Sequence, residues 1–260
     1  METAIGRRMF VGSVVAGLPL LTSTGRLAAQ AGTGSVHQHV DGVVAGDQVL
    51  EHIVRQLAGI HNAMRRQPRG EHMRAFAAQL RTLAVYGRQG GLDATVQAGI
   101  NTLIERDGRD RVLYTEVDVN RLRSDLKAYG AQPDERLLAA PITLDYAARS
   151  AALNGLLQSG VSIRLERIAA TLERMAPAVD ARMATTVRVN QIQYDAAYWE
   201  GYCSELWSQY TEAQFLSAAI CASAALPIVG AAFVPLCIAH QLAATFLAII
   251  YGGNCMNVRY

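Results

Sequence analysis

The sequence predicts an all-α protein, a helical bundle with long heptad-like helices that ends in a disulfide-stapled antiparallel helical hairpin. Three observations lead to this fold class. Apolar residues make up 51% of the 260 residues and aromatic residues only 7%, and the abundant alanine, leucine and arginine favour helix over strand. Apolar residues recur at helical spacing from Gln48 onward. All four cysteines lie within the last 58 residues, at intervals of 18, 16 and 18.

Amphipathic helices are expected from residue 48 to residue 130. The first carries apolar residues at steps of four, four, three and four from Val49 to Met64, which places them on one helical face. Similar stripes cover residues 73–84 and 96–104, and a fourth helix is expected from about 116 to 129. The breaks between these segments are marked by residues that end helices, which are Pro68, Gly70, Gly87, Gly90, Gly91, Gly108 and Gly130.

The clearest periodicity covers residues 142–175, where apolar positions alternate in steps of four and three. Two such runs are separated by Ser159 and Gly160. This spacing resembles a heptad seam and predicts long helices that pack at shallow angles, which could also support self-association of the chain. Residues 185–194 alternate in places like a strand, but a helix is favoured because no second strand candidate is available for pairing.

The cysteine spacing predicts how the hairpin is cross-linked. If the chain folds back at residue 229, residues whose numbers sum to 458 face each other, as Cys203–Cys255 and Cys221–Cys237 both do. Bonds along one helix are excluded, because 18 residues rise roughly 27 Å and a disulfide needs Cα atoms within ~7 Å. Two nested disulfides are therefore expected, in an oxidising compartment. The alternatives are four free thiols, or a metal site formed by Cys221, Cys237 and His240.

The same register places Trp207 opposite Tyr251, in an aromatic cluster at the base of the hairpin. Residues 213–251 are almost wholly apolar, and the second arm of the hairpin is long enough to span a bilayer. His240 and Gln241 lie at the middle of that arm, where polar groups are costly unless protein covers them. We favour a hairpin that the bundle buries, and membrane insertion or contact is the alternative.

The charge balance argues against nucleic-acid binding. The formal net charge is +2, with 24 basic and 22 acidic residues. Without residues 1–31, which contain three arginines and one glutamate, the balance is 24 − 3 = 21 basic against 22 − 1 = 21 acidic residues. A neutral chain lacks the positive field that attracts phosphates. Two sets of charged residues are expected to be solvated, namely Arg65, Arg66, Arg69 and Arg74 around one turn, and Glu166 with Glu173 on one helix face.

The first 31 residues have the three parts of an export signal. Arg7 and Arg8 precede Phe10, an uncharged run extends to residue 21, and Ala29 and Ala31 form a small-x-small cleavage site. This segment resembles a twin-arginine (Tat) signal peptide of an exported bacterial protein. The resemblance implies export of a folded chain to the periplasm or the medium, with possible membrane association. The expected organisation is a signal peptide (1–31), a flexible segment (32–47), a helical bundle (48–202) and the hydrophobic hairpin (203–260).

Catalytic motifs are absent from the sequence after the leader: it has no metalloprotease helix, nucleophile elbow, P-loop or dinucleotide fingerprint. His37 and His39 are weak candidates for metal ligands, and no cofactor is expected. The sequence thus favours a non-enzymatic structural or interaction role, with a protein or a membrane as partner. A membrane-active protein with a bacteriocin-like hairpin is the first alternative. A metal-binding periplasmic protein is the second.

Overall fold

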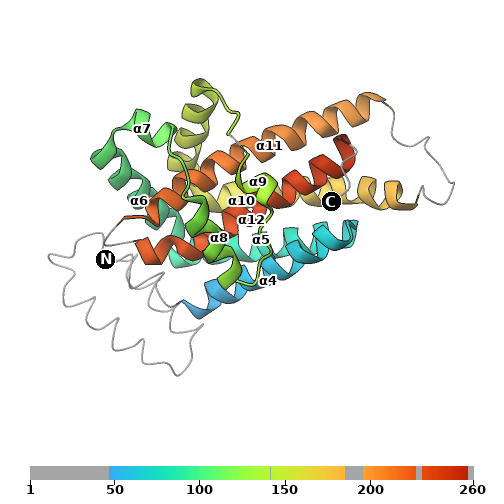
Figure 1. Ribbon diagram of the computed structural model, residues 1–260, viewed down its shortest axis with the longest axis horizontal. Helices are drawn as coiled ribbons and strands as arrows, with labels where there is room; N and C mark the ends of the chain where they lie inside the picture. The colour runs from blue at the N-terminus through green and yellow to red at the C-terminus, as the bar shows by residue number, and fades with distance from the viewer. Residues whose placement is uncertain (1–46, 141, 185–195, 227–229, 257–260) are drawn as a thin grey trace.

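The chain forms a bundle of α-helices (Figure 1), and the predicted fold class is confirmed. The structure is a computed structural model that describes residues 47–140, 142–184, 196–226 and 230–256. The segment 185–194, for which helix was favoured over strand, lies outside these residues. The helices are α4 (Gln48–Arg66), α5 (Gly70–Gly90), α6 (Leu92–Asp107), α7 (Arg109–Leu113), α8 (Val119–Ala128), α9 (Glu135–Leu138), α10 (Tyr146–Ala184), α11 (Ala196–Ser223) and α12 (Gly230–Cys255).

Aspartate side chains fix where several helices begin. Oδ1 of Asp47 accepts hydrogen bonds from two backbone N–H groups at the start of α4. Asp118 caps α8 in the same way, so α8 begins at Val119 rather than near residue 116. Asp145 accepts from the N–H of Ala148, and α10 therefore begins after residue 145 rather than near residue 142. Each cap satisfies N–H groups that have no partner within their own helix.

An aspartate of α10 caps α5, although these two helices lie far apart in the sequence. Asp180 near the end of α10 accepts the N–H of Gly70, the first residue of α5, at 2.7 Å. The carboxylate fits because Gly70 has no side chain: a Cβ atom there would lie 2.5 Å from the backbone oxygen of Ala176. At the other end, Asp93 accepts the N–H of Ser162 at 2.8 Å. Asp93 belongs to α6, so the two caps join α10 to the start of α5 at one end and to the start of α6 at the other.

A ladder of three ion pairs joins the exposed faces of α5 and α10. The pairs are Arg74–Asp180, Arg81–Glu173 and Arg88–Glu166, with N···O distances between 2.5 and 3.1 Å. The partners step by seven residues in opposite directions, as antiparallel helices at a shallow angle require. Arg74, Glu166 and Glu173 are partly exposed, as expected, but they also form ion pairs that the sequence alone does not predict. Exposed pairs contribute little stability each, but they identify the register of the two helices.

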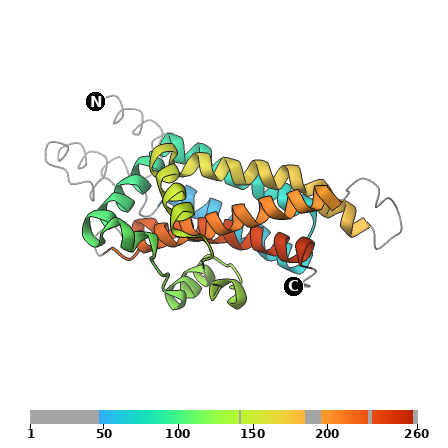
Figure 2. The same cartoon turned by 90° about the horizontal axis from the view of Figure 1, so that it is seen from above.

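Helix α10 bends at Gly160, between the two heptad-like runs. Gly160 has φ 79° and ψ 168°, which interrupts the helix. A Cβ atom at this position would lie 2.5 Å from Cγ of Asp93, so both the backbone conformation and the space favour glycine. Figure 2 shows the first half of α10, in yellow-green, crossing the bundle, while the second half, in yellow, runs along its long axis. The bend produces an elbow against α11.

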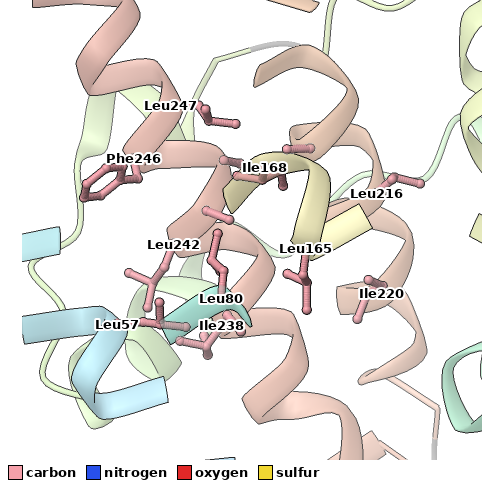
Figure 3. Packing of buried hydrophobic residues seen from close by; sticks show 14 of the residues in the cluster. Leu57, Leu80, Leu165, Ile168, Leu216, Ile220, Ile238, Leu242, Phe246 and Leu247 are labelled. Atoms are coloured by element: carbon pink, nitrogen blue, oxygen red, sulfur yellow. The ribbon is translucent and has the colours of Figure 1, made fainter. Parts of the chain in front are cut away.

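The C-terminal hairpin is part of the core of the bundle. Helices α11 and α12 pack along their length, and α12 also packs against α4. Figure 3 shows Ile238 and Leu242 of α12 meeting Leu57 of α4 and Leu80 of α5. The stretch from Phe233 to Cys255 is long and apolar enough to cross a membrane, but 94% of its most apolar window is buried inside the protein.

Helix α4 holds the turn that follows α8. Nδ2 of Asn62 donates to the backbone oxygen of Gly130, and Oδ1 of the same amide accepts the N–H of Gln132. Arg65 donates to the oxygen of Gln132 at 2.8 Å and lies 3.7 Å from a carboxylate oxygen of Asp134. Arg65 is therefore bound to the fold, in contrast to the solvated helix end expected for it. These contacts place the segment that contains α8 and α9 along one side of the bundle (Figure 2).

Candidate functional site

The two disulfides join the arms of the hairpin in the nested pattern that the sequence predicts. Cys203 bonds to Cys255 with Cα atoms 5.7 Å apart, and Cys221 bonds to Cys237 with Cα atoms 4.7 Å apart. Both separations are normal for disulfides. The alternative readings, four free thiols or a metal site using two of these sulfurs and His240, are wrong because no cysteine is free. Two such disulfides indicate an oxidising, extracytoplasmic environment.

The mirrored register extends between the disulfides. The rings of Trp207 and Tyr251, which the sequence places opposite each other, have centroids 5.0 Å apart. Oγ of Ser217 donates to Oε1 of Gln241 at 2.9 Å, and these residue numbers also sum to 458. The hairpin register is thus fixed by a polar pair near its middle as well as by its cross-links.

Buried histidines lie on either side of the interface between α4 and α12. His61 of α4 places Nε2 3.0 Å from Oγ1 of Thr245, while His240 donates from Nδ1 to the backbone oxygen of Leu236 at 2.9 Å. Burial lowers the pKa of each histidine to about 4, so both rings are neutral at pH 7. Nδ1 of His61 and Nε2 of His240 have no hydrogen-bond partner.

A cavity of about 480 Å³ lies where the segment 114–142 covers the middle of the hairpin. We call it the amide cavity, because side-chain amides of Gln214 and Gln241 line it beside apolar groups. The apolar lining includes Val117, Leu122 and Ile142. Its volume lies within the range of small-molecule sites, which typically combine apolar walls with a few polar groups. The amide cavity is the candidate functional site.

Gln214 lines the amide cavity and carries a buried acceptor atom that receives no hydrogen bond. Its side chain amide donates from Nε2 to the backbone oxygen of Ala140 at 3.1 Å, which fixes the amide orientation. Oε1 then has no hydrogen-bond partner, although the residue is only 8% exposed. A buried acceptor without a donor costs free energy, about 1–3 kcal/mol. A ligand that donates a hydrogen bond would remove this cost.

Arg149 binds the backbone of the segment that covers the amide cavity. Its guanidinium is therefore not free to pair with a ligand. The guanidinium donates to the backbone oxygens of Leu113, Ile142 and Leu144, at 2.6 to 2.9 Å. The Cζ atom of Arg149 lies 5.2 Å from the ring centroid of Tyr114, which is an exposed residue of the cavity lining. With these nitrogens already used for the cover, the amide cavity suits an uncharged ligand better than an anion.

The remaining predicted site residues fall in a part of the chain that the structure does not describe. The signal residues Arg7, Arg8, Phe10, Ala29 and Ala31 lie outside the described residues, as do His37 and His39. In the part of the chain that the structure describes, no three His, Cys, Asp or Glu side chains gather as metal ligands.

Sequence reasoning missed both Gln214 and Arg149. Gln214 interrupts the apolar stretch that begins at residue 213, and such an interruption is the signal that could have identified it. Arg149 occupies a position of the heptad-like seam, where a charged residue is out of place. Neither signal indicates which backbone groups the side chain reaches.

Comparison of the chain with protein families, with curated proteins and with solved structures finds no match.

Proposed function

We propose that the protein is exported through the Tat route and acts outside the cytoplasm as a non-enzymatic binding protein. The observation that supports binding is the unpaired Oε1 of Gln214, which is buried at the wall of a cavity large enough for a small molecule. The ligand is an uncharged compound with an apolar body and an N–H or O–H donor. The leader motif at Arg7 and Arg8, together with two disulfides, supports export.

The amide cavity supports binding without catalysis. The charged groups that line it are Arg149, whose guanidinium is bound to the cover, and Glu116, which is exposed. Arg149 lies over the ring of Tyr114, and the described lining holds no histidine, cysteine or second carboxylate that could form a general acid and base pair with Glu116. A neutral, partly apolar cavity can bind and release a compound unchanged.

A membrane-active hairpin is the second candidate, because α12 is long and apolar enough to cross a bilayer. Insertion would require α12 to exchange its protein contacts for lipid. The disulfides keep α11 attached to α12, so both helices would have to leave the core together. The burial of α12 therefore favours the first candidate.

Export is tested by replacing both arginines of the motif in the full chain, Arg7→Lys with Arg8→Lys, in a bacterium that has the Tat route. We expect wild type to be released by osmotic shock with both disulfides formed. The double variant should stay in the cytoplasm with reduced thiols. Arg26→Lys, a matched control in the same leader, should be exported like wild type. Unchanged export of the double variant would contradict the Tat assignment, and pelleting of wild type that resists carbonate would favour the membrane candidate.

Binding is tested by calorimetry of the oxidised protein with benzamide, an uncharged ring that carries an N–H donor. We expect benzamide to bind and its anionic analogue benzoate to bind about tenfold more weakly or not at all, because benzoate offers no donor to Oε1. Gln214→Met keeps the length of the side chain but removes the acceptor, and should abolish the preference for benzamide. Gln209→Met is the matched control, since Gln209 lies on the same helix, also has an unpaired Oε1, and lies outside the cavity. Equal binding of benzamide by wild type and Gln214→Met would refute the site.

A further inference from the structure

A second cavity, of about 340 Å³, lies in the elbow of α10. We call it the elbow pocket. One wall is the first half of α10 from Ala148 to Ser159, which extends roughly 16 Å along the helix axis. The second half of α10 contributes Arg164 and Arg167, and α11 closes the pocket with Glu212 and neighbouring residues. The bend at residue 160 therefore places two arginines at one end of a groove.

Arg164 is the most unusual residue of the elbow pocket, because it is a buried cation. It is only 5% exposed, and its ion pair with Glu212 has an N···O distance of 2.8 Å. A second terminal nitrogen donates to the backbone oxygen of Gln209 at 3.1 Å. Nε of Arg164 is buried and has no acceptor. Burying a charged group is costly unless every donor finds a partner, and here one does not.

The charged side chains that line the elbow pocket do not balance; the carboxylate of Asp93 lies beyond Gly160 and is bound to Ser162. Glu212 is the acidic residue of its lining, and it is already paired with Arg164. Arg167 is exposed and pairs with no carboxylate among the described residues. Burial lowers the pKa of Arg164, and the positive charge of Arg167 lowers it further. Two arginines against one glutamate leave a net positive charge at this end of the groove. An anion there would compensate the charge of Arg167 and place an acceptor beside the guanidinium of Arg164, whose Nε has none.

The other end of the elbow pocket is apolar. Ala148, Ala152 and Leu156 line the wall on α10, and Leu216 faces them from α11. Gly155 adds open space, since a Cβ atom there would meet no atom within 4 Å. An apolar wall with two arginines beyond the bend matches a molecule with an aliphatic chain and an acidic head. We propose that the elbow pocket binds an amphiphilic monocarboxylate, with its carboxylate at Arg164 and Arg167 and its chain along the first half of α10.

The proposal is tested by calorimetry of the full oxidised chain with decanoate, and with 1-decanol as the uncharged probe of equal chain length. We expect decanoate to bind at one site and 1-decanol to bind about tenfold more weakly, because the alcohol cannot compensate the arginines. Arg167→Gln should weaken decanoate about tenfold and leave 1-decanol unchanged. Equal affinity for the two probes, or an unchanged affinity for decanoate in Arg167→Gln, would overturn the assignment of the charged end.

The apolar end is tested by filling it. Gly155→Leu places a side chain in the groove, and the open surroundings of Gly155 mean that the fold itself should be unaffected. Gly59→Leu is the matched control, because Gly59 is an exposed helical glycine that also has nothing within 4 Å and lies on α4, outside the pocket. We expect Gly155→Leu to lose decanoate binding and Gly59→Leu to keep it, with benzamide binding unchanged in both. Retained decanoate binding in a folded Gly155→Leu would place the ligand elsewhere and refute the proposal.

Discussion

Removal of the disulfides should lower the free energy of unfolding by several kcal/mol while leaving the helices in place. The two bonds close loops with sequence separations of 52 and 16 residues. The lost chain entropy of the unfolded state corresponds to a contribution of about 4 kcal/mol to the free energy of unfolding from the outer bond and about 3 kcal/mol from the inner one. The contribution of the outer bond is smaller when the inner bond is intact. We expect Cys221→Ala with Cys237→Ala to lose about 3 kcal/mol in urea unfolding monitored by circular dichroism.

The two bonds can be separated by comparing the paired variants. Cys203→Ala with Cys255→Ala should be destabilised at least as much as the inner pair variant, because its bond closes the longer loop. The native helical signal should persist in both variants, since the core around α12 consists mostly of aliphatic and aromatic side chains, and Cys237 is the one buried cysteine among them. Loss of helical structure on removing the inner bond alone would show that the hairpin forms only when it is cross-linked.

Acid should destabilise the protein steeply because two histidines are buried without charge. His61 and His240 have pKa values of about 4 in the folded state, lowered by burial from 6.5. Above pH 6.5 the folded and unfolded states bind the same number of protons at these rings. Between pH 6.5 and 4 only the unfolded state becomes protonated, so stability falls as the pH falls, by up to about 1.4 kcal/mol per pH unit for each histidine. Below pH 4 both states are protonated and this loss is complete.

Urea unfolding at a series of pH values tests this expectation, with pH 5 to 6.5 as the informative range because carboxylates titrate mostly below it. His240→Leu removes one ring from an apolar setting and should reduce the slope by about half. His52→Asn is the control, because His52 is exposed on α4 and its replacement should leave the slope unchanged. An equally steep slope in His240→Leu would show that other groups cause the acid sensitivity.

The hairpin and the helix pair of α5 and α10 follow the same mirror rule, but only the register of the hairpin can be predicted from the sequence. The cysteines are rare, so their equal spacing about residue 229 was conspicuous. Arginines at 74, 81 and 88 and carboxylates at 166, 173 and 180 have the same relation. Charged residues are common on helix surfaces, and the turn between these two segments is not local. The pairing of these charges therefore depends on the packing of the two helices, which their spacing alone does not predict.

The bend in α10 and the two cavities depend on tertiary contacts that the apolar periodicity of the sequence does not predict. Ser159 and Gly160 indicated a break between two runs, but not the direction of the second run. That direction depends on Asp93, which caps the second half from another helix. The unpaired atoms of Arg164 and Gln214 are also consequences of three-dimensional packing. A sequence pattern can mark a polar residue as unexpected, but it cannot show that one of its atoms lacks a partner.

The placement of the two disulfides limits how the sulfurs can exchange. Thiol–disulfide exchange requires a thiolate to reach a sulfur of another bond directly. The four cysteines are the only ones in the chain, and 18 helical residues, a rise of roughly 27 Å, separate the two bonds along each arm. In the folded protein no sulfur of one bond can attack the other. Scrambled isomers can therefore arise only from unfolded chains, and refolding under mild oxidation should yield a single disulfide isomer.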